Sequence, residues 1–290
     1  MIPVRKLADL DLSAASGLVR LGKHLLVVAD DELFLDAYAL DGRSRAARIA
    51  FPSRAVLPDG EGRKRLKPDL ESLVVLPGGR VLATGSGSTD RRRTAFLFAA
   101  GPGDAAPSFR ATVDLTPLFE HLLGRIPELN LEGAAVCGKK LKLLQRGNSA
   151  RGQNAVIDLA LDGVLGALDH GRPLGANLVE NITQVNLGLL DKVRLGFTDA
   201  SPLPGDDSRI AFTAAAEDTD DPYLDGACAG SALGVLDAAG KVEWAEQIEG
   251  TNKIEGLTVE QDGRVLLVAD PDDRSRRAPL FEARPGRLQR

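Results

Sequence analysis

Cysteine, histidine and aromatic residues are all scarce in this chain of 290 residues. The two cysteines, Cys137 and Cys228, form no C-x-x-C pair, which disfavours a disulfide framework and a thiolate zinc site. Only three histidines are present, and this also disfavours zinc and iron centres. Aromatic residues make up 4% of the chain and no Trp-Asp dipeptide recurs, so the sequence is not that of a WD40-type repeat protein.

The chain also lacks a surplus of basic charge and long apolar runs. Its net charge is -5 with the two signs interspersed, so we expect no nucleic-acid partner, which would need a concentrated basic face. No apolar run approaches the roughly 18 residues of a membrane span. Residues 1–12 carry early charge and no apolar core of a signal peptide, which predicts a cytoplasmic protein without membrane attachment.

One hairpin pattern is repeated five times along the chain. Its clearest copy, residues 253–270 (KIEGLTVEQDGRVLLVAD), places two apolar runs around Asp262-Gly263, a dipeptide typical of turns in which two consecutive residues have positive φ. Glu255 opens the first strand of this hairpin and Asp270 closes the second. Four further copies cover residues 15–30, 70–86, 131–146 and, more weakly, 198–217, with Ser16, Glu71, Glu132 and Asp199 near the position of Glu255.

The repeat spacing predicts the fold. Successive copies are 55 to 67 residues apart, which is enough for a sheet of four antiparallel strands with its loops. We therefore expect an all-β chain, residues 1–290 forming a single five-bladed β-propeller domain, with six blades as the alternative. Residues 3–12 would supply the missing outer strand of the last blade and close the ring. The further strands are expected at 34–40, 46–51, 94–98, 109–115, 154–160, 182–189, 232–236, 242–247 and 279–283, with a short helix at 115–124 capped by Thr116.

The repeats predict a cluster of acids on the propeller axis. In a propeller the first strand of each blade lies innermost, so the five openings form a ring around one end of the axis. The loops after the second strands return to the same face and carry Asp30, Arg146, Asp270 and the run 91–93 of three arginines. Like charges in a narrow opening raise one another's pKa values unless something neutralises them. A hard cation with oxygen ligands does so, which predicts calcium; the alternative is that each acid ends a strand and accepts a backbone N–H of the neighbouring blade.

The serial pattern of these openings resembles that of the five-bladed calcium-activated nucleotidases (apyrases). The resemblance is carried by Ser16-Gly17-Leu18-Val19, Glu132-Gly133, the run 253–257 (KIEGL) and the hairpin at residues 22–31 (GKHLLVVADD). It implies one axial calcium held by Ser16, Glu71, Glu132, Asp199 and Glu255, with hydrolysis of nucleoside di- and triphosphates beside it. More distantly, the hairpins are similar to those of the esterase-like phytase and gluconolactonase propellers, which also carry an axial metal.

These observations predict a calcium-binding propeller that hydrolyses a phosphorylated or other anionic small molecule in the axial pore. The candidate catalytic residues are Asp30, Glu132, Arg146 and Asp270. A carboxylate left partly free would act as general base, and Arg146 would neutralise the anionic substrate or, equally well, pair with Asp30 or Asp270. The alternative function is a non-catalytic propeller with a structural axial ion that binds a protein or a small ligand.

Overall fold

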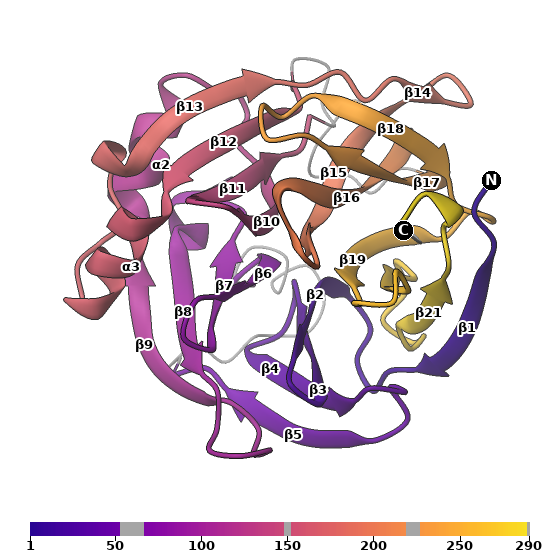
Figure 1. Cartoon of the computed structure of the whole chain (residues 1–290), viewed down its shortest axis with the longest axis horizontal. Coiled ribbons are helices and arrows are strands. Elements are labelled where there is room, and N and C mark those ends of the chain that lie inside the picture. The colour runs from indigo at the N-terminus through magenta and orange to yellow at the C-terminus, as the bar shows by residue number, and fades with distance from the viewer. Residues whose placement is uncertain (53–66, 148–151, 219–226, 289–290) are drawn as a thin grey trace.

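A computed structural model describes residues 1–52, 67–147, 152–218 and 227–288. The described chain forms five antiparallel sheets arranged around one axis (Figure 1). Each sheet has four strands, and one of them gains a two-residue strand, β14 (Leu189–Leu190). The predicted five-bladed β-propeller is confirmed, and the six-bladed alternative is wrong.

The blades follow one another along the chain, with the innermost strand first. Blade one contains β2 (Ala15–Leu21), β3 (His24–Ala29), β4 (Phe34–Ala39) and β5 (Arg45–Ala50). Blade two contains β6 (Leu70–Leu76), β7 (Arg80–Gly85), β8 (Thr94–Ala99) and β9 (Ser108–Asp114). Blade three contains β10 (Leu131–Cys137), β11 (Lys140–Gln145), β12 (Ala155–Ala160) and β13 (Val179–Gln184). Blade four contains β15 (Val193–Leu203), β16 (Asp206–Asp218), β17 (Ala227–Leu236) and β18 (Val242–Gln247).

The last blade joins the two ends of the chain. It contains β19 (Lys253–Val259), β20 (Val265–Asp270), β21 (Pro279–Ala283) and, as its outer strand, β1 (Val4–Asp9) from the N-terminus. Val4 pairs with Ala283, and Ile2 forms a bridge to Ile248 of the preceding blade. The predicted closure of the ring by the N-terminal strand is therefore confirmed.

Five apolar clusters hold the ring together, one at each junction between neighbouring blades. The cluster between blades one and two contains Leu35 and Phe98, and the one between blades three and four contains Phe197 and Phe212. Both faces of the inner strands are buried, so their sequences are nearly continuous apolar runs; β3, for example, is buried at all six residues. Stability is thus distributed over five equivalent junctions rather than one central core.

Two helices cover the outside of the junction between blades two and three. The predicted helix is present as α2 (Thr116–Leu123), but Thr116 is its first helical residue and not its cap, because the Asp114 carboxylate accepts the Thr116 N–H at 2.8 Å. A second helix, α3 (Leu161–Asp169), was not predicted; its buried Leu161, Val164 and Leu168 follow helical spacing, which Gly163 and Gly166 obscure. Short 3-10 turns occur at Asp90–Arg92, Ala176–Leu178 and Gly286–Leu288.

Two other local predictions need correction. The outer strand of blade three, expected at residues 182–189, is β13 (Val179–Gln184), because Val179 and Ile182 pack on the apolar cluster beneath α3. In the turn after β19 only Gly263 has positive φ, at 76°, since Glu260 N–H bonds to Arg264 O and closes a longer loop than a two-residue turn. Neither helix in the described part of the chain has the length and apolar character needed to cross a membrane.

Candidate functional site

A β-bulge at the start of every inner strand defines one end of the propeller axis. In each of the five hairpins the pairing register shifts by one residue at the same place. The extra residue of a bulge is left out of the ladder, so its side chain can be aimed away from the blade. The bulged residues are Ser16, Glu71, Glu132, Thr198 and Glu255.

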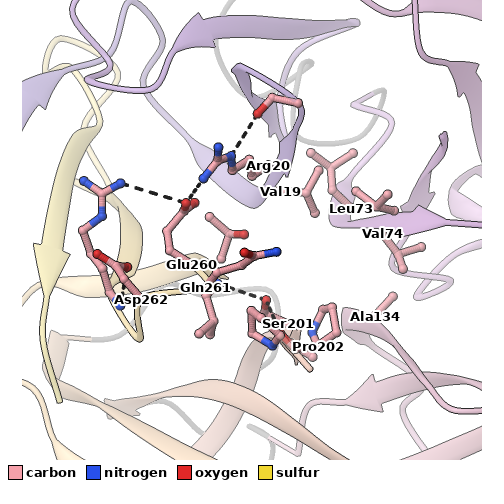
Figure 2. Close-up of a pocket in the computed structure, with 17 residues that line it drawn as sticks. Val19, Arg20, Leu73, Val74, Ala134, Ser201, Pro202, Glu260, Gln261 and Asp262 are labelled. Atoms are coloured by element: carbon pink, nitrogen blue, oxygen red, sulfur yellow. Dashed lines mark hydrogen bonds and ion pairs between the residues drawn. The ribbon is translucent and has the colours of Figure 1, made fainter. Parts of the chain in front are cut away.

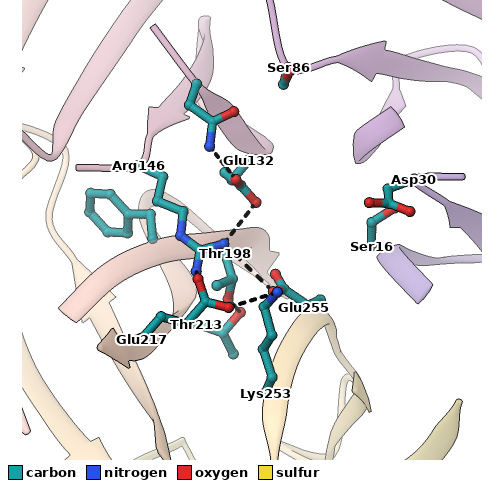
Figure 3. Close-up of polar contacts among 12 residues, drawn as sticks. Ser16, Asp30, Ser86, Glu132, Arg146, Thr198, Thr213, Glu217, Lys253 and Glu255 are labelled. Atoms are coloured by element: carbon teal, nitrogen blue, oxygen red, sulfur yellow. Dashed lines mark hydrogen bonds and ion pairs between the residues drawn. The ribbon is translucent and has the colours of Figure 1, made fainter. Parts of the chain in front are cut away.

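Arg146 lies among three of the acids at this end of the axis. Its Nη2 is 2.5 Å from Glu217 Oε2, and its Nη1 is 3.4 Å from Glu132 Oε2 and 3.6 Å from Glu255 Oε1 (Figure 3). Lys253 adds a second cation, 2.8 Å from Glu217 Oε1 and 3.2 Å from Glu255 Oε1. All of these side chains except Lys253 are at most 6% exposed, so the contacts are made in a medium of low polarity. Arg146 therefore pairs with three glutamates, not with Asp30 or Asp270.

A second group of acids lies on the side of blades one and two. Carboxylate oxygens of Asp30, Asp69 and Glu71 all lie within 4.8 Å of one another. The Lys67 ammonium contacts Asp30 and is 3.0 Å from Asp69, and Arg92 Nη1 is 2.7 Å from the other Asp69 oxygen. These two cations leave Glu71 without an ion pair among the described residues, although Lys67 is close enough to influence its pKa.

Burial is the main cause of raised pKa values among the described carboxylates at this end. The pKa of Glu132 is raised to about 8 by burial and by the Glu255 charge, against the opposing effect of Arg146. Burial also raises the pKa of Asp270 to about 8, although Lys253 acts in the other direction. The pKa of Glu71 is raised well above its ordinary range by burial and then by the Glu132 and Asp69 charges. Carboxylates with raised pKa values attract protons or other cations.

The five residues expected to hold calcium do not form a single ligand set. Glu132 and Glu255 belong to the Arg146 group, whereas Glu71 belongs to the Asp30 group. The Ser16 hydroxyl donates a hydrogen bond to the Leu70 carbonyl. Asp199 lies one residue beyond the bulge, where Thr198 takes the position equivalent to Glu255 and hydrogen-bonds Thr213 at 3.0 Å (Figure 3).

Asp199 instead connects the innermost strands to one another. Its Oδ1 accepts the Ala200 N–H and its Oδ2 accepts the Leu257 N–H of the next blade, both at 2.8 Å. Its side chain is fully buried, and burial raises its pKa while these backbone amides oppose the rise. Asp199 thus matches the alternative expectation, in which an acid at this place serves a neighbouring blade's backbone.

The inner strands of neighbouring blades approach each other closely just beyond the bulges. A Cβ on Gly133 would lie 2.9 Å from backbone atoms of Asp199 and Ala200, and one on Gly256 would lie 2.9 Å from the Leu18 nitrogen. Only glycine permits this approach.

Several residues of the site were not predicted from the sequence. Lys253, Asp69 and Asn130 each precede a bulged glutamate by two residues, and each lies close to that glutamate. Asn130 Nδ2, for example, donates a hydrogen bond to Glu132 Oε1 at 2.5 Å. A polar residue two positions before each repeated glutamate was the sequence signal that could have identified these three. Lys67 has no such marker, because it lies in the segment before β6, outside the repeated hairpin. Glu217 closes the weaker copy at residues 198–217, so the repeat already predicted it on this face.

The donor chemistry at Asp30, Asp69 and Glu71 fits a hard divalent cation. The three groups offer only carboxylate oxygens, which suit calcium or magnesium and not zinc. The pKa values of Asp30 and Glu71 are both raised, first by burial and then by neighbouring carboxylates, while Lys67 opposes the rise. The Arg146 group does not fit a cation in the same way, because Arg146 and Lys253 already pair with its glutamates.

The fold and this site define the class of protein: a five-bladed β-propeller with a buried, acid-rich cluster at one end of its axis. Residues 11–284 match the family described as "Family of unknown function (DUF6929)", and the chain belongs to that family. A search of curated proteins found no match.

Two solved structures illustrate the similarity of the chain path. Glutaminyl cyclase from Myxococcus xanthus aligns with 13% identity and a TM-score of 0.55, over 98% of this chain and 96% of that one. A structure named glucose dehydrogenase aligns with 14% identity and a TM-score of 0.47, over 96% and 98% of the two chains. At these identities the similarity concerns the fold alone, and the resemblance to apyrases stays a prediction.

Proposed function

We propose that the acidic end of the axis binds calcium through Asp30, Asp69 and Glu71. The observation that carries the proposal is the convergence of three carboxylates within 4.8 Å. Burial and the neighbouring carboxylates raise the pKa values of Asp30 and Glu71, which a bound cation would counteract. Lys67 occupies the same space, so calcium would compete with its ammonium group. The predicted Ser16, Glu132, Asp199 and Glu255 are not needed as direct ligands in this proposal.

We further propose that the protein is a hydrolase of small anionic molecules, with Glu132 as its proton donor. A pKa of about 8 leaves Glu132 largely protonated at neutral pH, as a general acid requires. Asn130 and Arg146 hold its two oxygens in place, at 2.5 and 3.4 Å. A bound calcium ion would polarise a phosphoryl or carbonyl oxygen of the substrate. Arg146 acts on the protein's own glutamates here and positions Glu132 instead of contacting the substrate.

A specific observation also favours a non-catalytic function. Arg146 and Lys253 already neutralise Glu132, Glu217 and Glu255, as expected of a buried charge cluster that only fixes the geometry of the ring. In that case the axial ion would be structural, and the acidic face would bind a ligand without transforming it.

Calcium titration calorimetry tests the first proposal. The wild-type protein should bind calcium with saturation, and Asp69→Asn should abolish binding, whereas Asp41→Asn, an exposed turn carboxylate, should leave it unchanged. Lys67→Met should bind calcium more tightly, because the competing ammonium group is gone. Absence of calcium binding by the wild-type protein would overturn this proposal.

The hydrolase proposal is tested by measuring product release in the presence of calcium and in the presence of chelator. The compounds are nucleotides, inositol phosphates, sugar phosphates and lactones. Glu132→Gln should still bind calcium but lose turnover by about 10²- to 10⁴-fold, the usual contribution of a general acid. Calcium binding combined with no turnover of any compound would favour the non-catalytic propeller.

A further inference from the structure

The end of the axis opposite the acidic cluster opens into a pocket of about 780 Å³. All five blades contribute to it through the inner strands β2, β6, β10, β15 and β19, together with the turn that follows β19. This volume lies within the range of small-molecule sites in proteins. None of its lining residues belongs to the Asp30, Asp69 and Glu71 group, so a ligand here does not depend on the calcium site proposed above.

The floor of the pocket is apolar, and its charged groups lie along one wall. Val19, Leu73 and Val259 are among the side chains that line it, with Pro202 beside them (Figure 2). Apolar lining that remains open to solvent is costly unless a partner covers it, which favours a ligand with an apolar body.

The charged residues that line the pocket are Arg20, Glu260, Asp262 and Arg264. The Glu260 side chain is 4% exposed, and its Oε2 accepts a hydrogen bond from the Arg20 guanidinium (Figure 2), whereas Arg264 Nη2 is 4.0 Å from the same oxygen. Glu282 Oε2 is 3.7 Å from Arg264 Nη1, while Glu282 Oε1 pairs with Arg5 at 2.7 Å. The Asp262 carboxylate accepts the backbone N–H of Arg264 at 3.1 Å.

The Arg264 guanidinium makes no hydrogen bond to a side chain in the described part of the protein. Its two ion pairs are longer than a hydrogen bond, and its buried Nε has no partner among the described residues. The side chain is 26% exposed, so its Nη groups can donate to a ligand in the pocket. Carboxylates match the guanidinium fork best, through two parallel N–H···O bonds.

We propose that this pocket binds a small amphipathic carboxylate, with its apolar body on the floor and its carboxylate on Arg264 and Arg20. The buried Glu260 draws the two guanidinium groups to one wall and so positions the head group of the ligand. Glu260 Oε1 also has no hydrogen-bond partner among the residues that the structure describes, so a cationic amphipath is the competing occupant that an experiment must exclude.

Calorimetry of the full chain with octanoate, octanol and octylamine decides between these occupants. Octanoate should bind with saturation and at least about tenfold more tightly than the other two, since charge-assisted hydrogen bonds contribute more than neutral ones. Tighter binding of octylamine, or no saturable binding of octanoate, would overturn the proposal. This arm uses only the wild-type protein, so it does not depend on the folding of any variant.

Substitutions then locate the site. Arg264→Gln should weaken octanoate binding about fivefold or more, whereas Arg277→Gln, a 64% exposed arginine that does not line the pocket, should not change it. Val75→Trp should fill the partly exposed side of the pocket and abolish binding. Melting curves would establish that each variant is folded, and unchanged binding by both Arg264→Gln and Val75→Trp would place octanoate elsewhere and overturn the proposal.

Discussion

The Arg146 guanidinium lies 2.5 Å from the Glu217 carboxylate, although the two residues belong to neighbouring blades. Replacing Arg146 by Met should lower the free energy of unfolding by about 3–5 kcal/mol at pH 8, because it leaves buried glutamates without a counter-charge. Urea denaturation would measure the loss. The matched control is Arg5→Met, whose exposed pair with Glu282 should contribute at most about 1 kcal/mol. Equal effects of the two substitutions would contradict the importance of the axial pair.

The stability of the fold should decrease as the pH rises from about 4.5 to about 8. The pKa of Glu132 is raised from its ordinary value of 4.5 to about 8, so within this window the folded protein binds more protons than the unfolded chain. Asp270, raised from 3.8 to about 8, acts in the same direction. Unfolding free energies measured in chelator at pH 5.5, 7 and 8.5 would reveal the slope. Glu132→Gln should flatten it and the exposed Glu120→Gln should not, and a slope that is the same in both would refute the assignment to Glu132.

Asp199 should be important for stability and not for calcium binding. Asp199→Asn replaces an oxygen acceptor by an NH₂ donor that faces the backbone N–H of Leu257 or Ala200, which should lower the free energy of unfolding by about 2–4 kcal/mol. The control is Asp41→Asn, which alters an exposed hydrogen bond from the Arg43 N–H in a turn and should lower the free energy of unfolding by about 1 kcal/mol or less. Thermal unfolding with and without calcium separates the two roles, since loss of the calcium response in Asp199→Asn would mean that this carboxylate is a ligand after all.

Two glycine substitutions should have opposite effects. Gly133→Ala forces a Cβ to within 2.9 Å of backbone atoms of the neighbouring inner strand, so it should lower the free energy of unfolding by about 1–3 kcal/mol or more. Gly166→Ala lies in α3 with nothing within 4 Å of the added atom, and should raise it by up to about 1 kcal/mol through helix propensity. Denaturant midpoints measure both. A neutral Gly133→Ala would mean that the inner strands can separate at the axis.

The position of every bulged residue except the one in blade four was available from the repeated hairpin. Glu71, Glu132 and Glu255 hold the same position in their copies of the hairpin. Because each copy forms the two inner strands of one blade, residues at equivalent sequence positions occupy equivalent positions in the propeller. In blade four the weaker copy led to Asp199 instead of Thr198. A shift of one residue reverses the direction of a strand side chain, so this small difference separates an axial group from one that bonds to the next blade.

Local pattern and period favoured five blades and predicted closure by the N-terminal strand and acids at one end of the axis, because these follow from short-range alternation and turn chemistry in consecutive residues. The partners of those acids depended largely on tertiary structure. Arg146 and Lys253 reach Glu217 only when neighbouring blades come together, and Lys67 reaches Asp30 only when the segment before β6 packs on blade one. The same holds for the pocket at the other end of the axis, since its wall of Arg20, Glu260 and Arg264 joins the first blade to the last.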